Sequence, residues 1–248
     1  MGVGKVAWVT GAGSGIGEAV ALRLARDGWR VAVSARSAAS LEALARKAPH
    51  IAAFPLDVTD NPAVADVVAR IEARLGPIDC AVLNAGTYVP VSARGFSAEK
   101  IAANFDVNVL GTAKCLEHLM PAMMERRRGH IAVVSSLTGY VGLPTAAGYG
   151  ATKAALINMC EALEPELAVR GVRMTVITPG FVDTPLTRKN DFAMPFLIGV
   201  EDAADRIVHG LASGRFEIAF PRRMSLAIRM LAALPHPLRL AITRRMVR

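Results

Sequence analysis

Residues 5–17 read Lys5-Val-Ala-Trp-Val-Thr-Gly-Ala-Gly-Ser-Gly-Ile-Gly17, an apolar run followed at once by a turn rich in glycine. The run predicts a short buried β-strand, and the apolar spacing after it predicts a helix that continues to Gly28. A glycine turn between strand and helix lets backbone N–H groups approach a pyrophosphate at the helix N-terminus, where the helix dipole favours an anion. The stretch therefore predicts a dinucleotide-binding α/β fold. Its candidate cofactor-binding residues are Gly11, Gly13, Ser14, Gly15, Ile16 and Gly17.

A second stretch, Ser136–Lys153, contains three candidate catalytic residues. Tyr149 and Lys153 stand four residues apart where a helical pattern begins, and residues i and i+4 share one face of a helix. The ammonium group is expected to favour the phenolate and to lower the pKa of Tyr149 from about 10. A lowering by about 3 corresponds to roughly 4 kcal/mol, more than one ammonium supplies, so a cationic cofactor ring would add to it. Ser136 ends a strand-like run, at the carboxyl edge where open α/β sheets bind ligands.

The bulk composition is consistent with this fold. The chain has 248 residues, of which 52% are hydrophobic and only 5% aromatic, which suits one large domain of buried parallel strands covered by helices. No run approaches the ~18 apolar residues of a membrane span. The apolar run after Lys5 is too short for a signal peptide, so the expected location is the cytoplasm. Cys80, Cys115 and Cys160 are expected to be buried small hydrophobes, and the five histidines lack paired metal-ligand spacing, so no metal is predicted.

Several further motifs occur in a fixed order along the chain. They are Thr10–Gly17, Leu83-Asn-Ala-Gly86, Asn108-Val-Leu-Gly111, Ser136, Tyr149-Gly-Ala-Thr-Lys153 and Pro179-Gly-Phe-Val-Asp-Thr184. Together they resemble the short-chain dehydrogenase/reductase family over roughly residues 3–220. The resemblance implies a single Rossmann-like domain over residues 1–221. This is a three-layer α/β sandwich whose doubly wound, parallel, seven-stranded sheet has helices on both faces.

The resemblance also implies the roles of individual residues. Tyr149 would be the general acid/base, Ser136 would bind the reacting oxygen, and Lys153 would assist Tyr149 and hold the nicotinamide ribose. Asn108 would disturb its helix and hold a water beside Lys153; the alternative is a polar residue that faces solvent. Ser136 is preferred to Ser135 because the family places its serine thirteen residues before the tyrosine. The remaining cofactor contacts would be Asp57, Val58, Asn84, Ala85, Gly86, Pro179, Gly180, Val182 and Thr184.

The end of the second predicted strand bears on the choice of cofactor. An Asp or Glu there would bind the ribose 2′-OH of NAD, whereas this chain has Ala35 and Arg36. An arginine pairs with a 2′-phosphate through charge-assisted hydrogen bonds, so NADP(H) is favoured over NAD(H). The alternative is that Arg36 stacks on the adenine, which NAD also permits. Many NADP-using relatives carry a basic residue within the glycine turn, where this chain has Ser14.

Two helices and one loop carry further expectations. Asn61 is predicted to cap a helix that begins at Pro62. Ser97 is predicted to cap a segment that leads into a long helix over about 101–127, and another helix is predicted from about Tyr149 to Val169. In relatives these two long helices pair between subunits, which implies a homodimer or homotetramer. Residues 185–199 are expected to form an apolar substrate lid, with a hydrophobic cover over the core as the equal alternative. Its apolar residues are Phe192, Met194, Phe196 and Leu197.

The last 27 residues, 222–248, lie outside the resemblance. They hold seven arginines and no acid, while the whole chain carries a net charge of +8. They predict two short amphipathic helices broken at Pro235-His-Pro237, and three partners are open: the domain itself, another subunit, or an anionic membrane surface at the inner face of the membrane. Packing on the body or a subunit is preferred. Nucleic acid is disfavoured because the tail lacks aromatic residues for stacking.

These features predict an enzyme that transfers a hydride between NADP(H) and a carbonyl or secondary alcohol, with an apolar or lipid-like small-molecule substrate. Two enzymatic alternatives are an NAD-linked alcohol dehydrogenase and a 3-ketoacyl thioester reductase. An alternative of another class is an NADP(H)-binding sensor or scaffold without turnover. The four catalytic positions all hold the expected residue types, which argues against an inactive protein.

Overall fold

The computed structural model describes residues 4–189 and 193–247. Its centre is one parallel sheet with the strand order β3-β2-β1-β4-β5-β6-β7. The order reverses between β1 and β4, and this switch opens a crevice at the carboxyl ends of the strands, where open α/β sheets bind ligands. The strands are β1 (Val6–Thr10), β2 (Arg30–Ser34), β3 (Ile51–Ala53), β4 (Ile78–Leu83), β5 (Gly129–Val134), β6 (Val172–Pro179) and β7 (Glu217–Phe220).

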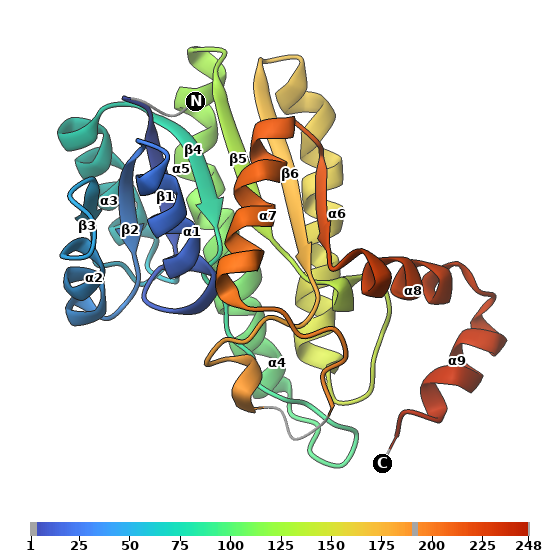
Figure 1. The fold of residues 1–248 in the computed structure, drawn as a ribbon. Helices are drawn as coiled ribbons and strands as arrows, with labels where there is room; N and C mark the ends of the chain where they lie inside the picture. The colour runs from blue at the N-terminus through green and yellow to red at the C-terminus, as the bar shows by residue number, and fades with distance from the viewer. Residues whose placement is uncertain (1–3, 190–192, 248) are drawn as a thin grey trace.

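Helices cover both faces of the sheet (Figure 1), so the predicted three-layer α/β fold is confirmed. One layer holds α1, α2 and α7, and the other holds α3, α5 and α6. The helices are α1 (Gly15–Arg26), α2 (Ala38–Ala45), α3 (Asn61–Leu75), α4 (Ala98–Phe105), α5 (Gly111–Glu125), α6 (Ala147–Ala168), α7 (Val200–Ser213), α8 (Arg222–Ala233) and α9 (His236–Arg244).

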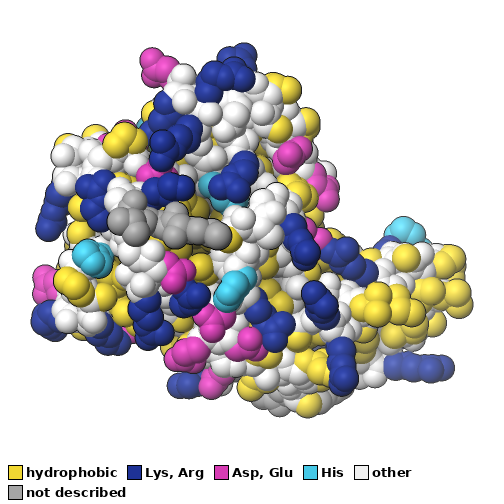
Figure 2. All heavy atoms as spheres, turned by 45° about the horizontal axis from the view of Figure 1, so that its top comes forward, with side chains coloured by type: hydrophobic (Ala, Val, Ile, Leu, Met, Phe, Trp, Pro, Cys, Tyr) yellow, Lys and Arg dark blue, Asp and Glu magenta, His cyan; other side chains and the backbone are white. Residues whose placement is uncertain are grey.

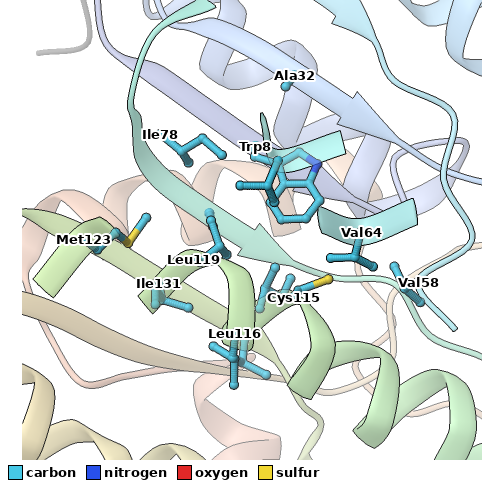
Figure 3. Close-up of a cluster of buried hydrophobic side chains, with 14 of the residues drawn as sticks. Trp8, Ala32, Val58, Val64, Ile78, Cys115, Leu116, Leu119, Met123 and Ile131 are labelled. Atoms are coloured by element: carbon cyan, nitrogen blue, oxygen red, sulfur yellow. The ribbon is translucent and has the colours of Figure 1, made fainter. Parts of the chain in front are cut away.

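The core follows from the alternation of side chains along each strand. In β1, Val6 and Trp8 point into one layer while Ala7 and Val9 point into the other. Trp8 lies among apolar side chains of β4 and α5 (Figure 3), and its indole N–H donates to Ser34 Oγ at 3.0 Å. The three cysteines are buried and unpaired as expected, and burial raises the pKa of each thiol to about 12.

One predicted N-cap was wrong, and two predicted helix starts lie within three residues of those in the structure. The N-cap of α3 is Asp60, whose carboxylate accepts the Ala63 N–H at 3.1 Å, so Asn61 is already helical. Ser97 does cap its helix by accepting the Lys100 N–H at 3.2 Å, but that helix begins at Ala98 and a π-helical turn over Asp106–Leu110 separates α4 from α5. α6 begins at Ala147, which places Tyr149 inside its first turn.

The predicted pair of tail helices is present as α8 and α9, divided at Pro235. α8 packs against β7, and a Cβ on Gly180 would lie 2.6 Å from Met224 Sδ. α9 stands apart from the sheet (Figure 1). Among the described residues, no helix has the length and apolar character needed to cross a membrane.

Candidate active site

The glycine turn has the geometry of a phosphate cradle. Gly11 and Gly15 adopt φ of +64° and +61°, a left-handed conformation that favours glycine. A Cβ on Gly17 would lie 2.5 Å from the Gly11 carbonyl oxygen, so no side chain fits there. The Ser14 hydroxyl makes no capping bond to α1, which leaves the backbone donors of the first turn without a side-chain cap. These features fit the pyrophosphate of a dinucleotide.

The turn after β4 holds the glycine turn in place. Thr10 Oγ1 accepts the N–H groups of Asn84 and Ala85 at 3.0 and 3.1 Å. The Asn84 side-chain amide donates to the carbonyls of Thr10 and Gly11 at 3.1 and 3.2 Å. The structure therefore uses Asn84 to join β1 to β4. Gly86 faces Asn108 and Lys153, since a Cβ there would lie 3.3 Å from Asn108 Oδ1 and 3.8 Å from Lys153 Nζ.

Arg36 and Asp57 lie at the same edge of the site. Arg36 is exposed and follows β2, while Asp57 accepts the Thr59 N–H at 3.0 Å and its hydroxyl at 2.8 Å. The hydrogen bonds from Thr59 lower the pKa of Asp57, and the positive charge of Arg36 adds to this lowering. Val58 is buried and packs against Gly111, where a Cβ would lie 2.7 Å from Val58 Cγ2.

Ser136, Tyr149 and Lys153 converge beyond the carboxyl end of β5. The Ser136 hydroxyl lies 3.4 Å from the Pro179 carbonyl oxygen, accepts the Thr138 N–H at 3.2 Å and interacts with the Tyr149 phenol. Lys153 Nζ lies 5.4 Å from the centre of the Tyr149 ring and donates to the Val134 carbonyl at 2.8 Å. The Tyr88 ring packs edge-on against Tyr149 at a centroid distance of 5.3 Å.

The expected lowering of the pKa of Tyr149 is wrong for this structure. Loss of solvent around the phenol raises its pKa to about 12, more than the hydrogen bond from Ser136 lowers it. Burial also lowers the pKa of Lys153 to about 8, because its ammonium group loses hydration. The Tyr149 phenol therefore keeps its proton at neutral pH in this structure.

Neighbouring polar residues separate into distinct roles. Ser135 is buried, and its hydroxyl donates to the Lys153 carbonyl of α6 at 2.8 Å. Ser136, not Ser135, is therefore the serine that interacts with the Tyr149 phenol. Asn108 lies fully buried at the centre of the π-helical turn, so the solvent-facing alternative is excluded. Its amide accepts the Thr87 N–H at 2.7 Å and donates to the Thr87 carbonyl at 3.1 Å and Thr152 Oγ1 at 3.0 Å.

The segment after β6 closes the other side of the site. Thr184 lies against the glycine turn, since a Cβ on Gly15 would lie 3.1 Å from Thr184 Cγ2. Val182 is buried, and its carbonyl accepts the Thr187 hydroxyl at 2.5 Å. Of the predicted lid, Phe196 and Leu197 are exposed. Phe192 lies outside the described residues.

A polar cluster centred on Glu217 was missed by the sequence analysis. Glu217 accepts the hydroxyl of Thr178 at 2.8 Å and that of Tyr140, and it forms an ion pair with Arg229 of α8. The Arg229 guanidinium also lies 5.6 Å from the centre of the Tyr140 ring. The cluster joins the tail to the loop that follows Ser136. No local pattern signals it, because its members come from four separate segments.

Replacing Glu217 by glutamine is expected to lower the free energy of unfolding by about 1–3 kcal/mol, because it removes the ion pair and weakens two accepted hydrogen bonds. Urea denaturation measures the change. Glu166→Gln, which alters an exposed carboxylate on α6, is the matched control. Equal stability losses in the two variants would contradict the conclusion that Glu217 stabilises the contact between the tail and the body.

A cavity of about 390 Å³ lies between α1 and α7, beside Ser14 and Gly15. Its charged lining is largely self-paired, with Lys47 to Glu18 and Arg23 to Asp205 both at 2.7 Å. Ser136 and Tyr149 do not line it, so we do not assign it as the substrate site. Within the described ranges, no group of three or more His, Cys, Asp or Glu side chains could hold a metal ion.

Comparisons with known proteins agree with this arrangement. The family model described as short chain dehydrogenase matches residues 5–194. An oxidoreductase of Myxococcus xanthus is 39% identical over 246 residues, covering 98% of this chain and 97% of that protein. A 3-ketoacyl-(acyl-carrier-protein) reductase from Brucella melitensis, solved with NADH, has a TM-score of 0.80, 28% identity, and coverage of 88% of this chain and 95% of that chain. ElxO with bound NADP has a TM-score of 0.79 and 25% identity, covering 87% and 97%.

Proposed function

Because the chain belongs to the short-chain dehydrogenase family and is an oxidoreductase, we propose that it uses NADP(H) to interconvert a carbonyl and a secondary alcohol on an apolar substrate. The observation that carries the proposal is the convergence of the Ser136 hydroxyl, the Tyr149 phenol and the Lys153 ammonium beyond the end of β5, with the phosphate cradle at the end of β1. A bound nicotinamide supplies or accepts the hydride.

The chain's own residues supply the proton and the orientation. In the reducing direction, the Tyr149 phenol donates its proton to the carbonyl oxygen as hydride reaches the carbon, and the product is an alcohol. The Ser136 hydroxyl donates a hydrogen bond to the same oxygen and stabilises the negative charge that develops there. Lys153 places a positive charge 5.4 Å from the centre of the phenol ring. The family resemblance adds that Lys153 holds the nicotinamide ribose hydroxyls.

Asn108 acts in this proposal as a positioning residue. Its amide joins the backbone of Thr87, directly after the Asn84–Gly86 turn, to Thr152, the neighbour of Lys153. Asn108 lies at the centre of the π-helical turn, and its amide is buried on the inner side of this turn, where it makes these hydrogen bonds. The site therefore uses Asn108 to fix the distance between the cofactor-side turn and α6.

The apolar character of the substrate is inferred from the surroundings of the reacting groups. Tyr88 packs on Tyr149, Met224 of α8 covers Gly180, and Phe196 and Leu197 are exposed in the segment beyond Thr184. These side chains offer contact area without charge. A screen of ketones and aldehydes, followed through NADPH absorbance, should favour apolar substrates. Turnover restricted to small polar carbonyls would contradict this part of the proposal.

The proposal includes a homodimer or homotetramer formed through α5 and α6. It rests on the family resemblance, in which the corresponding helices pair between subunits. Light scattering on the purified protein tests it, since a monomer at micromolar concentration would contradict the expected assembly.

Arg36→Asp is expected to raise the Kd for NADPH by roughly 10- to 150-fold, because a charged hydrogen bond to the 2′-phosphate is worth about 1.5–3 kcal/mol. The Kd for NADH should change by less than about threefold, since NADH has no such phosphate. Fluorescence titration measures both. Arg46→Asp makes the same charge change at the end of α2 and serves as the control. Unchanged NADPH affinity in Arg36→Asp would overturn the cofactor assignment, and cofactor binding without turnover of any carbonyl would favour a sensor.

A further inference from the structure

The C-terminal arm, residues 222–247 with helices α8 and α9, concentrates exposed apolar side chains. Seven of the twelve large hydrophobic residues that are exposed in the described part of the chain lie in it. They are Leu226, Met230, Leu238, Leu240, Ile242, Met246 and Val247. Figure 2 shows the arm projecting from the body, with apolar side chains gathered on it and basic side chains beside them. So much exposed apolar surface on a projecting element indicates an interaction surface.

The arm has two different faces. On α8, Met224, Ser225 and Ile228 turn toward the body and are buried or partly buried. Leu226 and Met230 lie one turn apart on the outward face, 62% and 63% exposed, and Arg222 lies one further turn away on that face. On α9, Thr243 is buried and Arg239 donates to the Ala232 carbonyl at 3.1 Å, which leaves Leu238 and Ile242 outward.

The positive charge of the arm indicates which kind of surface it binds. Residues 222–248 hold seven arginines and no acid, so they contribute +7 of the net +8 of the chain. Arg229 is paired with Glu217, but Arg222, Arg223, Arg244 and Arg245 are exposed and have no ion-pair partner among the described residues. Two copies of this arm would repel each other, whereas anionic lipid headgroups would neutralise it. Apolar residues flanked by arginine suit a helix that lies in a membrane interface.

We propose that the C-terminal arm binds the surface of an anionic lipid bilayer. Leu226, Met230, Leu238 and Ile242 enter the headgroup–acyl boundary, and the four free arginines contact lipid phosphates. Because α8 starts directly after β7 and packs over Gly180, the bound arm brings the carboxyl edge of the sheet close to the lipid. This inference stands on the arm alone and does not depend on the proposed reaction.

Vesicle flotation of the full chain tests the inference. Wild type is expected to bind mixed phosphatidylcholine–phosphatidylglycerol vesicles and to bind phosphatidylcholine vesicles much more weakly. Each basic residue near an anionic surface changes binding by about fivefold, so replacing Arg222, Arg223, Arg244 and Arg245 by Gln should weaken it at least about 100-fold. The control replaces four exposed body arginines by Gln and should retain binding within about threefold. These are Arg46, Arg94, Arg170 and Arg215.

A second variant separates lipid binding from subunit contact. Leu226→Ser with Met230→Ser keeps every charge and should also weaken binding to the mixed vesicles, while light scattering shows an unchanged assembly and circular dichroism an unchanged fold. Failure of wild type to bind the mixed vesicles would overturn the proposal. So would equal loss in the body-arginine control, or dissociation of a dimer by Leu226→Ser with Met230→Ser while vesicle binding persists.

Discussion

Replacing Tyr149 by phenylalanine is expected to lower kcat by about 10²- to 10⁴-fold, the usual contribution of a positioned general acid. The variant loses one hydroxyl group and keeps the ring. That ring packs against Tyr88 and lies 5.4 Å from Lys153 Nζ. The Kd for NADPH should therefore stay within about threefold of wild type, because only the proton donor is removed. Stopped-flow or steady-state turnover with an apolar ketone, together with fluorescence titration, measures both quantities.

Tyr88→Phe is the matched control for this prediction. It removes the same hydroxyl group from the ring that packs edge-on against Tyr149, and it leaves the donor in place. Its kcat should change by less than about tenfold, well below the loss assigned to a general acid. Near-normal turnover in Tyr149→Phe, or equal losses in both variants, would contradict the role of Tyr149 as proton donor.

The raised pKa of Tyr149 bears on which protonation state of the phenol begins the proposed proton transfer. With a pKa of about 12, the phenol keeps its proton throughout the neutral range, which suits donation to a carbonyl oxygen. The opposite reaction needs a phenolate to accept the proton of an alcohol. The sequence placed Lys153 correctly beside Tyr149 but not the solvent exclusion around the phenol, because burial depends on the packing of Tyr88 and other distant segments.

The sequence predicted those features that rest on local pattern. The apolar run in β1 and the glycine spacing after Thr10 were sufficient to predict the first strand, the turn and the helix that follows it. The family resemblance then predicted the full sheet of seven strands, which the structure has. The disturbance at Asn108 was also expected, and the structure shows a π-helical turn there. The N-cap of α3 was misplaced by one residue because Asp60 and Asn61 are both good capping residues and only the folded backbone decides between them.

Contacts between distant segments could not be predicted in this way. The cluster residues Glu217, Tyr140, Thr178 and Arg229 lie far apart along the chain, and the sequence around each of them does not indicate its partners. The same holds for Ser135, whose bond to the Lys153 carbonyl separates it from Ser136. In both cases the sequence supplied the residue types, whereas the tertiary packing assigned their partners.

Replacing Lys153 by methionine is expected to reduce turnover severely and to change how stability depends on pH. Lys153 is buried, its Nζ donates to the Val134 carbonyl at 2.8 Å, and its pKa is lowered to about 8. Methionine keeps much of the length of the side chain without the charge. The variant therefore loses the positive charge beside Tyr149 and also the unfavourable burial of an ammonium group.

The sign of the pH effect follows from proton binding in the two states. Below pH 8 the ammonium is charged in both the folded and unfolded chains, and the folded state carries the full burial penalty. Between about 8 and 10.5 the folded protein releases this proton while the unfolded chain keeps it, so the stability of wild type rises relative to Lys153→Met. The gain is at most about 3 kcal/mol, and it ends above the unfolded pKa.

Urea unfolding of wild type and Lys153→Met at pH 7, 8.5 and 10 measures this difference. Lys100→Met, which replaces an exposed lysine on α4, is the control and should show a difference from wild type that is nearly constant with pH. A constant difference for Lys153→Met as well would mean that Lys153 keeps its proton in the folded protein above pH 8. In that event burial would not destabilise the charged form of Lys153, and the lowered pKa assigned to this lysine would be wrong.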